Sequence, residues 1–219
     1  MYYDLIASLP HLPHFLSAEH CPITPLRLRQ RLGLLRPGDA ELLQRVWPLV
    51  QWRGDGLAIE SDHVITERYR QLVESPVPGP LRGYLDYRMT QQTLLAALRR
   101  KQAAMGPPAT ALFADSSSPI HQISRNWEKP DFGLANVYPW LTGASDQLAS
   151  GDALGLEQTM VELNWRWLSR MADQSVFGFA AVVAFVFKWD LLRSWLANDS
   201  AEAKQRFQKL IDRVTHVAD

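Results

Sequence analysis

The last third of the chain carries apolar residues at helical spacing on two faces of one segment, and this pattern limits the fold more than any other feature. One stripe consists of Leu156, Met160, Leu163, Trp167 and Met171, and a second of Val161, Trp165 and Leu168. A helix that is apolar on two faces belongs in the middle of a bundle. The segment Val176 to Leu196 follows with almost no polar position before Lys188, so it is predicted to be a second buried helix. We expect Leu163, Trp167, Phe185 and Trp189 to share one buried cluster.

The apolar runs of the chain are too short to cross a membrane. The longest one, residues 176–187, ends at Lys188, whereas a spanning helix needs about 20 apolar residues. The first residues lack a basic segment and contain Asp4 within their apolar run, which is not typical of a signal peptide. We therefore expect a cytoplasmic protein without direct membrane insertion.

The first two thirds also show the helical period between breaks at proline and glycine. Leu42 to Val50 and Ile65 to Val73 follow it, with Asp39 and the pair Ser61 and Asp62 as candidate N-caps. Residues 81–104 predict one long helix, stopped by Gly106-Pro107-Pro108. Tyr2 to Leu9 reads as a strand or an extended arm. Because no period of two persists, we predict an all-α fold.

The long helix 81–104 has a polar interruption in its apolar stripe. Arg88, Gln91 and Gln92 lie there, and Arg99, Arg100 and Lys101 close the helix. Two interpretations stay open for the interruption: the helix turns its middle to solvent, or these residues form a recognition site. The basic end complements the helix dipole. These six residues are our candidates for contacts with a partner.

The remaining segments give the expected organisation. Residues 106–150 are predicted to be an irregular connection with one short helix after Ser116 to Pro119. The connection contains Trp127, Phe132, Tyr138 and Trp140, which either hold it to the core or form an exposed site for a partner.

Glu67 to Arg99 and Glu162 to Trp195 repeat one plan of a shorter and a longer helix. This repeat predicts a bundle of two related helical modules, residues 1–105 with a proline-rich arm and residues 151–219, that can also form one compact domain.

The end of the chain is predicted to be a separate helix. Asn198, Asp199 and Ser200 are the candidate caps, and the apolar face consists of Phe207, Leu210, Ile211 and Val214.

No pattern of reactive residues points to a cofactor, a metal or catalysis. His11, His14, His20 and Cys21 are close in sequence, but a Leu-Pro step separates the first two, and they are expected to lie apart or at the surface. The chain has no Gly-x-Ser-x-Gly turn and no phosphate-binding glycine motif. Its 23 Lys and Arg balance 23 Asp and Glu, whereas nucleic-acid binders show a basic excess. We expect a protein that is not an enzyme and does not bind nucleic acid.

Several segments resemble a family of short proteins encoded beside bacterial V/A-type ATPase genes. They are the opening Tyr2 to Pro10, Pro22-Ile23 with the Leu- and Arg-rich helix after it, Tyr84 to Tyr87, Leu94 to Arg99, Phe185 to Leu196, and Phe207 to Ile211. That family is similar in turn to the C subunit of archaeal-type ATPases, whose counterpart in the vacuolar enzyme is the d subunit.

The resemblance implies a helical fold like that of the C subunit and a non-catalytic function. The C subunit is an all-helical funnel of three modules that joins the central stalk to the membrane rotor ring on the cytoplasmic side. The present length matches about two such modules. The implied partners are the proteins of the stalk and the ring, and the implied role is coupling or assembly. The alternatives are a free-standing helical adaptor unrelated to the ATPase, or an enzyme whose site the sequence does not reveal.

Overall fold

The computed structural model describes residues 1–52, 62–107 and 119–215, and the side chains within 1–52, 64–107 and 119–198. Helices make up more than half of the chain, and the described residues contain no strand, which confirms the all-α prediction. In chain order the helices are α1 (Tyr3–Ser8), α2 (Pro25–Leu32), α3 (Pro37–Val50), α4 (Asp62–Val73), α5 (Gly79–Gln102), α6 (Ile120–Arg125), α7 (Trp140–Ser150), α8 (Ala153–Asp173) and α9 (Phe179–Thr215).

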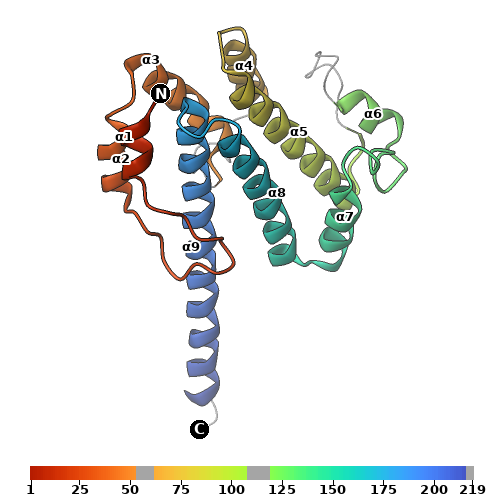
Figure 1. Ribbon diagram of the computed structural model, residues 1–219. Helices are drawn as coiled ribbons and strands as arrows, with labels where there is room; N and C mark the ends of the chain where they lie inside the picture. The colour runs from red at the N-terminus through yellow and green to blue at the C-terminus, as the bar shows by residue number, and fades with distance from the viewer. Residues whose placement is uncertain (53–61, 108–118, 216–219) are drawn as a thin grey trace.

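The pair α8 and α9 forms the centre of the fold (Figure 1). The two apolar faces of α8 explain its position, because one face packs on α9 while another meets α5 and α7. On its other side α9 contacts α3 and α5. The second half of α9 extends beyond the remaining helices in Figure 1.

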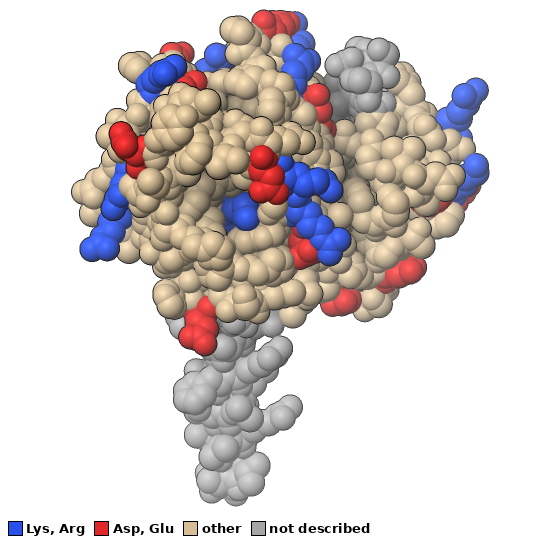
Figure 2. Space-filling view, in the orientation of Figure 1, with Lys and Arg blue, Asp and Glu red and all other residues tan. Residues whose placement is uncertain are grey.

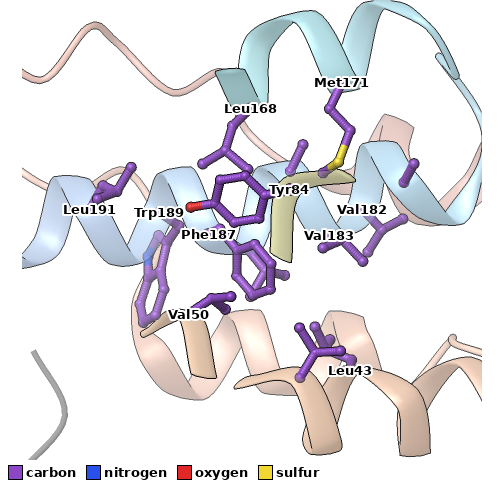
Figure 3. Packing of buried hydrophobic residues seen from close by; sticks show 14 of the residues in the cluster. Leu43, Val50, Tyr84, Leu168, Met171, Val182, Val183, Phe187, Trp189 and Leu191 are labelled. Carbon is purple, nitrogen blue, oxygen red and sulfur yellow. The ribbon is translucent and has the colours of Figure 1, made fainter. Parts of the chain in front are cut away.

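The larger hydrophobic cluster joins the N-terminal part of the chain to α8 and the first half of α9. It combines residues of the first three helices and the start of α5 with residues of α8 and α9. Figure 3 shows the Tyr84 ring of α5 lying among Leu168 of α8 and Phe187 of α9, and the Tyr84 and Phe187 rings stack with centroids 5.6 Å apart. Such aromatic contacts add to the stability that burial itself provides.

A smaller cluster lies where the second half of α5 meets α6, α7 and the start of α8. Phe132 is fully buried in it, and Trp127 stacks on Phe132 with ring centroids 5.5 Å apart. Tyr138 and Trp140 are partly buried against the same cluster. The aromatic residues of the connection therefore hold it to the core.

The expected cluster of four residues is confirmed only in part. Trp189 is buried in the larger cluster, and Trp167 and Phe185 pack against it. Leu163 instead packs against the smaller cluster. The reason is that Leu163 lies on the side of α8 that faces α5 and α7 rather than α9.

Three predicted segments differ from the structure. Tyr2 to Leu9 forms the short helix α1 rather than a strand or extended arm, and the Tyr2 backbone N–H donates to the Phe177 carbonyl at 2.7 Å. Residues 140–150, predicted to be irregular, form α7. The first residues of the segment predicted from Val176 lie in a turn, with Val176 and Phe177 exposed, because α9 begins only at Phe179.

Two cap predictions are also corrected. Helix α3 begins at Pro37 after the N-cap residue Arg36, and Asp39 lies in its first turn, where its carboxylate accepts a hydrogen bond from the Tyr2 hydroxyl. The break expected at Asn198 is absent, since α9 continues to Thr215. Ser61 and Ser116–Ser118 lie outside the described residues, as do the side chains of Asp62, Phe207, Leu210, Ile211 and Val214. The division into two related modules stays a prediction.

Candidate functional site

Three polar side chains are buried between α5 and α8. Arg88, Gln91 and Asn164 are 6%, 1% and 0% exposed. Arg88 and Gln91 follow Tyr84 on the face of α5 that is turned toward α8, at the helical spacing of four and then three residues. The polar interruption of the predicted stripe is therefore part of the interior, and the interpretation that places Arg88 and Gln91 in solvent is wrong.

These side chains form one hydrogen-bonded network. The Asn164 amide Nδ2 donates to Gln91 Oε1 at 2.7 Å and to the Met160 carbonyl at 2.8 Å. The Tyr84 hydroxyl donates to Asn164 Oδ1 at 3.1 Å, and Arg88 Nη1 donates to Gln91 Oε1 at 2.8 Å. Asn164 thus links α8 to two positions of α5. Buried polar groups need such partners because they have lost their hydrogen bonds to water.

The network leaves two buried donors unused. Arg88 Nε and Gln91 Nε2 have no hydrogen-bond partner among the described residues. Burial lowers the pKa of Arg88 and raises the pKa of Tyr84, but an arginine side chain stays protonated in proteins. Arg88 is consequently a buried cation whose hydrogen-bonding capacity is only partly used within the described part of the chain.

Trp52 and Asp190 complete the surroundings of Arg88. The Arg88 guanidinium lies over the Trp52 ring, 4.5 Å from its centroid. The Trp52 backbone N–H donates to Asp190 Oδ2 at 2.7 Å, and Asp190 is 4% exposed. Burial raises the pKa of Asp190, and the Trp52 hydrogen bond, Arg193 and the charge of Arg88 act in the opposite direction.

A cavity of about 550 Å³ lies directly beside this network. Its wall is built from α5, the end of α7, the turn at Gly151 and the first turns of α8. The polar lining includes Arg88, Gln92, Arg99, Gln147, Asp152 and Glu157, and Trp52 also lines the cavity. The volume falls in the range of small-molecule sites, about 300–1,000 Å³.

The remaining candidate contact residues have different surroundings. Gln92 is half-buried and Arg99 is exposed, and both line the cavity. Arg100 Nε donates to the Gly106 carbonyl at 2.6 Å. Lys101 Nζ donates to the carbonyl groups of residues 127, 128 and 129 at 2.7, 3.1 and 2.6 Å, so it holds the following loop.

The N-terminal histidines lie at the surface, as predicted. His11, His14 and His20 are exposed, and Cys21 is half-buried. His14 Nε2 lies 3.2 Å from a carboxylate oxygen of Glu162. Within the part of the chain that the structure describes, no group of three or more His, Cys, Asp or Glu side chains is placed to hold a metal ion.

Sequence reasoning did not identify Trp52, Asn164 or Asp190 as parts of this region. Asn164 offered a usable signal, because it interrupts the apolar faces of α8 between Val161 and Leu168 and so demands a buried partner. Trp52 and Asp190 offered no such signal, since their contact joins segments far apart in the chain.

Together, the fold and this region define an all-helical scaffold with a polar cavity beside a buried arginine. The family model described as "Protein of unknown function (DUF2764)" matches residues 63–218, which is well over half of the chain. The chain belongs to this family. Neither the curated proteins nor the solved structures gave a significant match. Across the described residues, every helix is too short or too polar to span a bilayer.

Proposed function

We propose that the chain is a non-catalytic component of a V/A-type ATPase, similar to the C subunit, which couples the central stalk to the membrane rotor ring or assists their assembly. In this role it is peripheral to the cytoplasmic face of the membrane and reaches the membrane only through the ATPase. The proposal rests on the resemblance of several segments to proteins encoded beside such ATPases.

The observation that best supports a mechanical role is the length of α9. Its 37 residues correspond to roughly 55 Å at 1.5 Å per residue. A single continuous helix transmits force without the bend that the expected break at Asn198 would introduce. This supports an element that must stay stiff between two partners.

The first half of α9 is tied to three other segments. Trp189 Nε1 donates to the Ile23 carbonyl at 2.9 Å, and Asp190 accepts the Trp52 backbone N–H. Asn198 Nδ2 donates to both carboxylate oxygens of Glu157 at 2.6 Å. These bonds fix the direction in which α9 leaves the body, as a coupling element requires.

The surface offers polar contacts rather than one highly charged patch. Figure 2 shows basic and acidic side chains interspersed over the visible face. Arg99 is exposed and has no hydrogen bond or ion pair to the described residues. Gln92, Arg99, Arg100 and Lys101 remain the proposed contacts. Gln91 instead joins α5 to α8 from the interior through Asn164, and the buried Arg88 donates to Gln91.

Co-purification from the native host tests the proposal. A tagged copy of the chain is expected to retain stalk and ring proteins in mild detergent. The double variant Arg99→Glu and Arg100→Glu should reduce their recovery at least several-fold while the helical content stays unchanged.

The end of α2 provides the matched control. Arg29 and Arg31 are exposed basic residues in its last turn. The double variant Arg29→Glu and Arg31→Glu makes the same charge change and should leave recovery intact. Repeated absence of stalk and ring proteins from the unaltered chain's preparations would contradict the proposal and favour a free-standing adaptor.

A further inference from the structure

Two arginines of α5 line the cavity beside the buried network. Arg88 is buried, at 6% exposure, whereas Arg99 is exposed. The two residues, with Gln92 between them, lie on one face of α5 because they are separated by 4 and 7 positions. At 1.5 Å per residue the two arginine backbones are roughly 16 Å apart along the helix.

Arg88 is a buried residue of the cavity wall whose hydrogen-bond donors are only partly used within the described residues. Its Nη1 donates to Gln91, but its Nε has no partner among the described residues. In the same part of the chain, no carboxylate lies within ion-pairing distance of its guanidinium, and Asp190 acts on it only through space. A buried charge without a paired counter-charge is costly, so an anion entering the cavity gains more from Arg88 than it would from a solvated arginine.

The acidic residues of the wall are already committed to other donors. Asp152 caps α8 by accepting the Gly155 backbone N–H at 2.9 Å. Glu157 accepts from Trp52 Nε1 at 3.3 Å and from Asn198 at 2.6 Å. The positive end of the α8 dipole also lies at the cavity, because residues 151–153 form part of its wall.

We propose that this cavity binds a small organic or inorganic anion with two charged groups, phosphate or carboxylate. One group pairs with the free edge of the buried Arg88 guanidinium, whose planar N–H donors match a carboxylate or phosphate in two parallel bonds. The second group reaches the exposed Arg99 and the Gln92 amide. The site shares Gln92 and Arg99 with the proposed ATPase contacts, but its test uses the isolated chain and does not depend on the ATPase role.

Thermal unfolding of the full chain at constant ionic strength tests the site. The probes are inorganic pyrophosphate, succinate and citrate, with sodium chloride as the reference. At least one probe should raise Tm saturably, by about 5–10 °C when its concentration is one hundred times Kd. A response to pyrophosphate alone assigns a phosphate ligand, and a response to succinate or citrate alone assigns a carboxylate ligand.

Variants separate this site from general charge effects. Arg99→Gln should weaken binding of the responding probe at least tenfold. Arg100→Gln is the matched control, because Arg100 is the next residue of α5 and does not line the cavity. Arg88→Met, which removes the buried charge but keeps a long side chain, should abolish the shift.

Two results would overturn the inference. One is a Tm that rises with no probe beyond the effect of sodium chloride. The other is a shift that Arg99→Gln leaves intact or that Arg100→Gln reduces equally. If Arg88→Met fails to fold, the Arg99→Gln and Arg100→Gln pair still decides.

Discussion

The hydrogen bond between Tyr84 and Asn164 should be one of the strongest couplings between α5 and α8. Both side chains are almost completely buried, at 1% and 0% exposure. The Tyr84 hydroxyl donates to Asn164 Oδ1, and the Asn164 amide donates to Gln91 Oε1. Replacing Asn164 by alanine removes these two bonds and the bond to the Met160 carbonyl, and it leaves the tyrosine hydroxyl without an acceptor.

The expected cost follows from these bonds. An orphaned buried hydroxyl costs about 1–3 kcal/mol, and a lost hydrogen bond about 1 kcal/mol. Asn164→Ala should therefore lower the free energy of unfolding by about 2–4 kcal/mol. Tyr84→Phe should cost about 1–2 kcal/mol, because it leaves Asn164 Oδ1 without its donor.

The double variant should cost less than the two single variants added together. With both groups removed no partner is orphaned, so the coupling energy should be about 1–2 kcal/mol. Tyr87→Phe is the control: Tyr87 stacks on Trp167 without a hydrogen bond from its hydroxyl to the described residues, and removal of this hydroxyl should cost less than about 0.5 kcal/mol.

Urea unfolding followed by tryptophan fluorescence and circular dichroism measures these values, since the chain contains eight tryptophans. Strict additivity of Asn164→Ala and Tyr84→Phe would refute the reasoning. So would a loss from Tyr87→Phe as large as that from Tyr84→Phe.

Two further predictions concern backbone conformation and pH. Gly143 lies exposed within α7, and a Cβ at this position would meet no atom within 4 Å, whereas Gly151 ends α7 with φ +73°. Gly143→Ala should therefore stabilise the protein by about 0.5–1 kcal/mol, and Gly151→Ala should destabilise it by about 1 kcal/mol. Urea unfolding measures both values. Equal effects of the two would contradict this assignment. Burial raises the pKa of Asp190, so between its unfolded and folded pKa values the native state holds the proton that the unfolded state has released. Stability due to this residue is therefore present at low pH and is lost as pH rises through the folded pKa. Asp190→Asn keeps an acceptor for Trp52 and should gain stability relative to the native sequence as the pH rises above the unfolded pKa of Asp190, about 3.9. A difference in unfolding free energy between the two proteins that does not change with pH would contradict a raised pKa for Asp190.

The sequence was sufficient for α5 and α8 because their apolar periods reflect burial directly, whereas α9 was predicted to be two helices with a break at Asn198. The two stripes of α8 placed it correctly at the centre, and the absence of proline between residues 81 and 104 allowed α5 to be predicted within two residues at each end. α7 was missed although Leu141, Ala144 and Leu148 follow the helical spacing, because the segment is short and contains glycine.

The site could be predicted only in part, because periodicity assigns polar residues to solvent. Gln91 finds its buried partner in Asn164, which lies 73 residues later in the chain. The sequence around Arg88 and Gln91 therefore gives no local signal of this contact. Gln92 and Arg99 were selected as contact candidates, and the structure places both at the cavity. The shape of that cavity depends on how α5, α7 and α8 pack, which spacing along one helix does not specify.

The most direct test of the proposed ATPase role begins from the other partner. The V/A-type ATPase of the native host is purified through a tag on a protein of the rotor ring, and the chain is quantified by mass spectrometry in complete and partly assembled complexes. A coupling component should be present at about one copy per central stalk, and an assembly factor should be enriched in partly assembled complexes. Absence of the chain from both preparations would contradict the proposed role.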